Sequence, residues 1–203
     1  MKKNKKAFSM IEVLVWILIF TMWIISVYSI INTTLNLNDY NKNYIIASYL
    51  AREQVELVRN IRDSNYKKIQ IYNQLNPVSD NHTFLFEYWK YYKIENDFSF
   101  TNGFPISISE ISNFWEWESE LNNKMQNYRL CLTTDNIYTF DCSWIWDKTQ
   151  FYKYIKIDKV DYNDWTSNRT IDDAFKVTSK VIWYMRWYHE FKLNSIFTDF
   201  KRF

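Results

Sequence analysis

Glycine, histidine and cysteine are all scarce in this chain of 203 residues, which contains one glycine, two histidines and two cysteines. An average protein has about 7% glycine. The sequence has no glycine-rich phosphate loop and no Gly-x-Ser-x-Gly nucleophile elbow. His82 and His189 do not stand at a metal-ligand spacing from each other or from a cysteine. We therefore expect no enzymatic activity, no cofactor and no metal site.

The charged residues do not point to a particular partner. The formal net charge is only +2, and the lysines and arginines are spread along the chain, so there is no strong electrostatic argument for binding DNA. We expect two groups of acidic residues on surface segments to be solvated or to cap structural elements: Asp172-Asp173, and the pair Asp161 and Asp164. A calcium loop over Asp158–Asp164 is the alternative for the second group.

The strongest feature of the sequence is an apolar run from Phe8 to Ile31, which is long enough to cross a bilayer as a helix. The leader before it, residues 1–7, has four lysines and no acid, which places the N-terminus in the cytoplasm and exports the rest of the chain. A secretory signal peptide would have a shorter apolar core with small residues at its far end. Here the small residue, Ala7, lies on the cytoplasmic side.

Glu12 is the one charged residue in this run. A charge inside a membrane helix costs about 2.5–3.5 kcal/mol on insertion scales, and it is therefore a candidate functional group that needs a partner. We predict a single-pass protein of the cytoplasmic membrane with an exported body. A plain signal anchor or an uncut signal peptide would explain the lysines and the apolar run, but not Glu12.

The segment Lys5-Lys6-Ala7-Phe8-Ser9-Met10-Ile11-Glu12 resembles the N-terminal signal of type IV prepilins and pseudopilins. In that family a prepilin peptidase in the membrane cuts on the cytoplasmic side of the helix and methylates the new N-terminus. The resemblance implies cleavage between Ala7 and Phe8, and pairing of the Phe8 amine with Glu12 of a neighbouring subunit during filament assembly. Ala7 departs from the family pattern, which usually has glycine before the cut.

The function implied by this resemblance is a structural subunit, a minor pilin or pseudopilin, of a type IV pilus or a type II secretion-like filament. The expected partners are inner-membrane lipid, the prepilin peptidase and other pilin subunits. An assembly platform and a cytoplasmic ATPase would act indirectly, and the assembled subunit would lie in an extracellular filament. The alternative is a membrane-anchored binding module whose exported aromatic residues bind a glycan, a surface or DNA.

Helical periodicity continues beyond the apolar run. Apolar or small side chains recur at steps of three and four on one stripe, together with Gln54: Tyr44, Ala47, Ala51, Val55, Val58 and Ile61. Charged residues are expected on the other faces: Arg52, Glu53, Glu56, Arg59 and Arg62. No glycine or proline interrupts residues 8–63. The sequence thus predicts one long helix with a membrane part, residues 8–31, and an amphipathic part, residues 32–63, that packs on a sheet.

Residues 64–203 are predicted to form the exported domain, with an antiparallel sheet in its last third. Strand patterns occur at Thr83–Tyr88, Ile106–Ile111, Tyr128–Thr133, Ile137–Cys142, Phe151–Ile157, Ala174–Tyr184 and Tyr188–Phe197. The third and fourth segments, and the last two, read as hairpins. A long helix packed on such a sheet is an α+β fold, and this arrangement is also what the resemblance to pilins implies.

Cys131 and Cys142 fall on the two strands of one predicted hairpin, in the part of the chain predicted to be exported. This position suits a disulfide in an oxidising compartment. Two free thiols are the alternative.

The chain has ten tryptophans, and several stand where glycine would fit better: Trp16, Trp23, Trp144, Trp146, Trp165 and Trp187. Trp165, for example, follows Asn163-Asp164, where a turn would take glycine. We hypothesise that the gene reads UGA as glycine and that these positions are glycine in the native protein. Trp183 fits a strand and is expected to be a true tryptophan. The alternative is an aromatic-rich binding surface, and inspection of the codons distinguishes the two.

Overall fold

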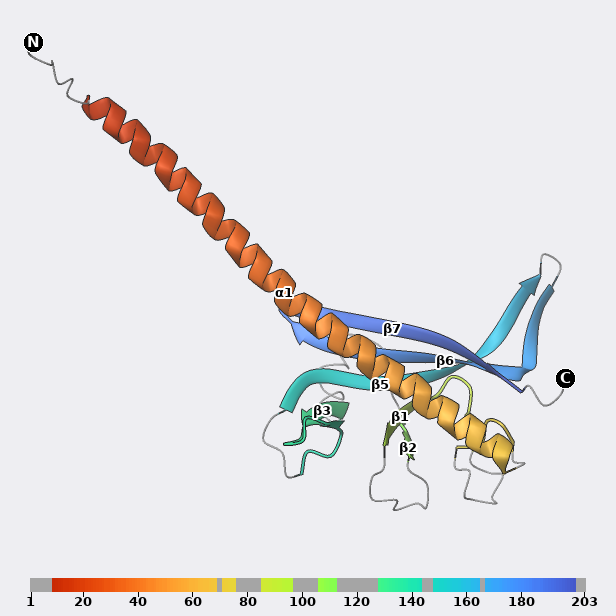
Figure 1. Ribbon diagram of the computed structural model, residues 1–203. Helices are drawn as coiled ribbons and strands as arrows, with labels where there is room; N and C mark the ends of the chain where they lie inside the picture. The colour runs from red at the N-terminus through yellow and green to blue at the C-terminus, as the bar shows by residue number, and fades with distance from the viewer. Residues whose placement is uncertain are drawn as a thin grey trace, which may run out of the picture. The chain divides into compact units, whose positions relative to one another are not determined.

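The computed structural model describes residues 9–68, 71–75, 85–96, 106–112, 128–143, 148–164 and 167–199. These residues form one helix followed by seven strands (Figure 1). The elements are α1 (Met10–Lys67), β1 (Tyr91–Asn96), β2 (Ile106–Glu110), β3 (Arg129–Leu132), β4 (Tyr138–Thr139), β5 (Lys148–Asp164), β6 (Ser167–Met185) and β7 (Trp187–Thr198). The chain divides into two compact units, residues 1–43 and residues 44–203.

Helix α1 is continuous over 58 residues, as the absence of glycine and proline predicts. It ends at Lys67, four residues beyond the predicted end. The side-chain amide of Asn65 fixes the direction of the chain after the helix. Its Nδ2 donates to the main-chain oxygens of Tyr72 (3.2 Å) and Gln74 (2.8 Å). These two bonds hold the segment after the helix against its last turn.

Within the second unit, α1 packs on the sheet through the predicted stripe. Ala47, Ala51, Gln54, Val58 and Ile61 are each 0% exposed. The main core joins the last turns of the helix to residues of five strands and of the segments that connect them: Val55, Leu57, Val58, Ile61 and Tyr66 from the helix, with Tyr72, Phe86, Tyr92, Ile94, Ile106, Ile155, Ile157, Phe175, Val177 and Phe197. This confirms the α+β fold, a long N-terminal helix packed on a C-terminal antiparallel sheet.

Strand β5 is the central strand of the sheet. It pairs with β6 along its length, and on its other edge it pairs with β3 and β1. β7 lies beyond β6, β2 beyond β1 and β4 beyond β3, and every pairing is antiparallel. Apolar side chains on both faces of β5 are buried, since Ile155 faces the main core while Tyr154 packs with Ile111 and Ile182 in a second cluster.

Most of the predicted strands are present. β3 and β4 form the predicted hairpin, in which Cys131 is paired with Thr139. β6 and β7 form the predicted second hairpin, and it reverses at Arg186, which has a φ of 62°. The predicted strand Thr83–Tyr88 is wrong in its described part, where only Leu85 makes an isolated bridge, to Gln74, and Tyr88 lies in a turn. β1 was not predicted.

Two tryptophans of the described chain bear on the hypothesis that some tryptophans are native glycines. Trp89 has a φ of 67° and is 60% exposed. This left-handed conformation is uncommon for a bulky residue, whereas glycine adopts it without steric cost. Trp183 is 0% exposed and stacks on His189, as expected of a true tryptophan. Trp89 therefore joins the candidate positions, while Trp144, Trp146 and Trp165 lie outside the described residues.

We expect Trp89→Gly to raise the free energy of unfolding by about 1 kcal/mol, because relief of the left-handed strain outweighs the exposed contact of the Lys156 ammonium with the ring, 5.7 Å from its centroid. Trp183→Gly is the matched control. It should lower stability by about 3–5 kcal/mol, since it empties a fully buried site. Urea unfolding of the two variants measures both effects. A destabilised Trp89→Gly variant would argue that Trp89 is native.

Candidate functional site

The predicted assembly residues lie at the N-terminal end of the chain. Ala7 and Phe8 are outside the described residues, so the cleavage site and the pairing of Phe8 with Glu12 stay predictions. Glu12 lies in the first turn of α1 and its side chain is exposed. The helix around it is long and apolar enough to span a membrane, which is compatible with a membrane anchor or a signal sequence.

The apolar segment of α1 exposes large side chains, and two of its hydroxyl groups bond to the helix backbone. Trp16, Phe20 and Trp23 are each more than 60% exposed, and no residue of its most apolar window is buried. Thr21 Oγ1 donates to the Leu18 carbonyl at 2.8 Å, and Ser26 Oγ donates to the Met22 carbonyl at 2.9 Å. Such bonds suit an apolar surrounding, because they give these two hydroxyl groups acceptors within the helix itself.

A buried lysine joins the sheet to α1 in the second unit. Lys153 is 0% exposed, and its Nζ lies 3.0 Å from Glu53 Oε2, where it donates a charge-assisted hydrogen bond. Glu53 Oε1 accepts a second bond from Asn96 Nδ2 at 3.3 Å. Glu53 lies off the apolar stripe, as expected, and its side chain is 32% exposed. Its carboxylate links α1 to both β5 and β1.

Two further polar contacts hold α1 on the sheet. Ser179 Oγ donates to Gln54 Oε1 at 2.7 Å, and both residues are 0% exposed. At the end of the helix, Tyr66 Oη donates to the Thr198 carbonyl at 2.9 Å. Arg62 packs beside it, with its guanidinium carbon 5.2 Å from the centre of the Phe197 ring. The helix is therefore attached through specific polar contacts as well as through the apolar core.

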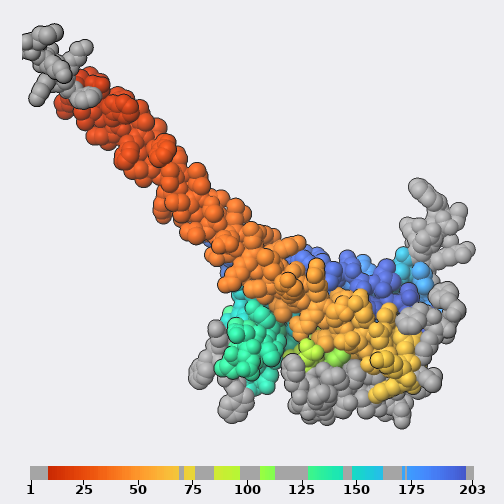
Figure 2. Space-filling model, in the orientation of Figure 1, coloured from red at the N-terminus to blue at the C-terminus, as the bar shows by residue number. Residues whose placement is uncertain are grey.

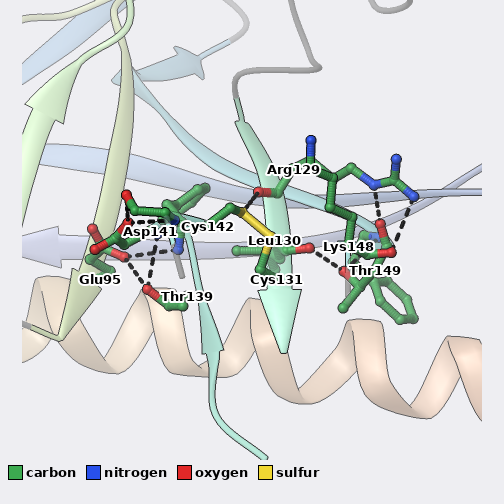
Figure 3. Close-up of a disulfide and its surroundings, with 12 residues drawn as sticks. Glu95, Arg129, Leu130, Cys131, Thr139, Asp141, Cys142, Lys148 and Thr149 are labelled. Carbon is green, nitrogen blue, oxygen red and sulfur yellow. Dashed lines mark hydrogen bonds between the residues drawn. A yellow bond between two sulfur atoms is a disulfide. The ribbon is translucent and has the colours of Figure 1, made fainter. Parts of the chain in front are cut away.

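The predicted disulfide is present between Cys131 and Cys142, with Cα atoms 5.6 Å apart (Figure 3). The segment that carries Cys142 is also tied to β1. Glu95 Oε2 accepts a hydrogen bond from the Phe140 amide at 3.2 Å, and Asp141 Oδ1 accepts one from the Ser143 amide at 3.0 Å. The bonds from Ser143 hold the pKa of Asp141 below its usual range. The disulfide supports an exported body, because such bonds persist in oxidising compartments.

Removing this disulfide should lower the free energy of unfolding by about 2–3 kcal/mol on the loop-entropy account. The variant to test is Cys131→Ala with Cys142→Ala, since alanine leaves no buried polar group at the fully buried position 131. The midpoint of thermal unfolding should fall by about 4–12 °C. Adding reductant to the wild-type protein should reproduce most of this fall, and unchanged midpoints in both experiments would contradict it.

Burial also shifts the ionisation of two tyrosines of the main core. It raises the pKa of Tyr92 to about 12, although the hydrogen bond that the Tyr92 oxygen accepts from the Glu87 amide at 2.8 Å acts in the opposite direction. Burial is also the main cause of the raised pKa of Tyr72. Both hydroxyls are therefore neutral at physiological pH, and neither is poised for acid–base chemistry.

Within the described part of the chain, no three histidine, cysteine, aspartate or glutamate side chains gather as a metal site would require. Comparison with known proteins does not assign the chain to a family, because no family model, curated protein or solved structure matches it. The architecture itself is pilin-like: a long N-terminal apolar helix packed, in its distal part, on a C-terminal antiparallel sheet.

Proposed function

We propose that this chain is a subunit, minor rather than major, of a type IV pilus or a related type II secretion-like filament. The observation that carries the proposal is the difference between the two parts of one continuous helix, an exposed apolar part and a part packed on the sheet. Its N-terminal part exposes only a long apolar surface with one acid, Glu12, while its distal part is fastened to a disulfide-bonded sheet domain. Such a subunit needs other copies or relatives to cover the exposed helix.

Assembly would proceed from the membrane. The segment 8–31 inserts in the cytoplasmic membrane, prepilin peptidase removes residues 1–7, and the helix is then extracted into a filament core made of such helices. Leaving lipid is possible because the neighbouring helices replace it as an apolar surrounding. Glu12 and the Phe8 amine would each be costly alone in this core, and they neutralise one another when paired.

Intact-mass analysis and N-terminal sequencing of the protein from its native membrane test the proposal. We expect a chain that begins at N-methylated Phe8. A chain that still begins at Met1 would contradict the proposal and would leave an anchored exported domain instead. The same spectrum reports the state of Cys131 and Cys142, and it shows whether tryptophan positions carry the mass of glycine.

A binding module is the second candidate, and exposed aromatic residues at the turn between β6 and β7 favour it. Trp187 is 75% exposed and Tyr184 is 53% exposed. Stacking on such side chains is worth about 1–3 kcal/mol per base or comparable planar ligand. A UGG codon at position 187 would favour this function, whereas UGA would remove its main residue.

A further inference from the structure

The outward face of α1 in the second unit carries a regular seam of exposed side chains. They recur at alternating steps of four and three residues: Ile45, Tyr49, Arg52, Glu56 and Arg59. Ile45 is 54% exposed and Tyr49 is 65% exposed. Figure 2 shows this part of the helix, coloured orange to yellow, uncovered on the viewer's side. Spacing of this kind is what a helix presents to a second, nearly parallel helix.

The charges of this seam are only partly satisfied within the subunit. Glu56 pairs with Arg59, with Nη1 to Oε distances of 2.6 and 2.8 Å. Arg52 is exposed, and its guanidinium makes no hydrogen bond or ion pair with any described residue. The subunit therefore offers one arginine with five donors and a carboxylate that has capacity for a second partner.

A groove beside the seam leaves room for a side chain from outside. It has a volume of about 450 Å³ and lies between α1 and the edge strand β7. Arg52, Glu56 and Arg59 line it from the helix, and Asn194 and Ser195 line it from the strand. An incoming charged side chain would find both polar partners and partial shielding from water there, which strengthens an ion pair.

The sequence spacing selects the partner. In the proposed function, the amine at position 8 of one copy meets the carboxylate at position 12 of its neighbour, so adjacent copies are displaced by four residues, about 6 Å along a helix. Arg52 and Glu56 repeat this pattern, with the positive group first and the negative group four residues later. The same displacement therefore brings Arg52 of one copy level with Glu56 of another.

We propose that Arg52 of one subunit forms an ion pair with Glu56 of an adjacent copy of this chain, and that this contact fixes the axial position of the two exported domains. The inference rests on the proposed function. Glu56 would then bridge its own Arg59 and the Arg52 of its neighbour. The partner is a second copy rather than another ligand because both halves of the contact, and the spacing between them, are present in this chain.

Charge exchange tests the contact in cells that make the full chain. Arg52→Glu alone and Glu56→Arg alone should each reduce filaments about tenfold, which corresponds to about 1.4 kcal/mol. Co-expression of the two variants should restore filaments. In a mixed filament, residue 52 of each variant lies beside residue 56 of the other, and the two residues then have opposite charges. A contact within one subunit would give no rescue on mixing, so failure to rescue would overturn the inference.

Cross-linking gives the independent measurement. Co-expressed Arg52→Cys and Glu56→Cys chains should form a disulfide-linked dimer in sheared filaments, while either variant alone should not. Arg52→Cys with Asn60→Cys is the matched control, since Asn60 is exposed but lies off the seam. Filaments of methylated subunits that show no specific dimer would overturn the inference and leave the proposed function standing. Absence of Phe8 processing would instead overturn the proposed function.

Discussion

Replacing Glu12 with valine should abolish incorporation into filaments and leave cleavage after Ala7 nearly intact. In the proposed function, the peptidase would cut on the cytoplasmic side of the membrane segment, before residue 8, and would not need the carboxylate. Assembly would need it, because the amine of Phe8 would otherwise enter the apolar filament core without a counter-charge. A buried charge that has lost its partner costs about 3–5 kcal/mol, which corresponds to a loss of more than a hundredfold.

The measurement is a comparison of processed subunit in the membrane with subunit in the sheared filament fraction. Glu12→Gln keeps the size of the side chain and removes its charge, so it should fail like valine. Glu12→Asp keeps the charge and should retain part of the assembly. Normal filaments that contain the Glu12→Val chain would refute the role of this pair, whatever the N-terminal sequence shows.

The second large effect is expected at the ion pair between α1 and β5. Glu53→Ala should lower the free energy of unfolding by about 2–4 kcal/mol, because it leaves the Lys153 ammonium buried without its carboxylate. This loss is smaller than for a fully buried pair, because the Glu53 side chain is 32% exposed and water screens the charge of the lysine. Asn96 also loses an acceptor, although it lies at the surface.

Urea unfolding of the exported domain in the full chain, held in detergent, measures this effect. Glu53→Ala with Lys153→Met should recover most of the stability, because the methionine fills the site without a charge. Glu56→Ala is the matched control one helical turn away. Its pair with Arg59 is exposed, and its loss should change stability by only about 0.5 kcal/mol. Equal effects of Glu53→Ala and Glu56→Ala would contradict the role of Lys153.

The features that could be predicted from the sequence have local signals. The apolar run, the leader lysines and the absence of glycine and proline predict α1 to within a few residues of its ends. Alternation predicts the segment Phe151–Ile157 of the longer strand β5. The turn residues between Cys131 and Cys142 predict the hairpin that brings these cysteines together. The stripe from Ala47 to Ile61 predicts which face of the helix is buried.

Lys153 shows the limit of local patterns. It stands in phase with Phe151, Ile155 and Ile157 along β5 and is buried with them. Nothing nearby in the chain identifies its partner, because Glu53 is 100 residues away. β1 was missed for a related reason: it is held by pairing with β2 and β5, and its own sequence has only a short alternating pattern.

By itself, the sequence determined the apolar helix, its acidic residue, the amphipathic stripe and the disulfide hairpin, because each depends on residue type and spacing over a few turns or strands. Only the tertiary structure decided which charges of α1 are used inside the subunit. Glu53 reaches Lys153, while Arg52, one residue before it, faces outward without a described partner. The difference depends on how the helix is rotated about its axis and on its position along the sheet. The packing of the whole core fixes both, and no local sequence pattern encodes them.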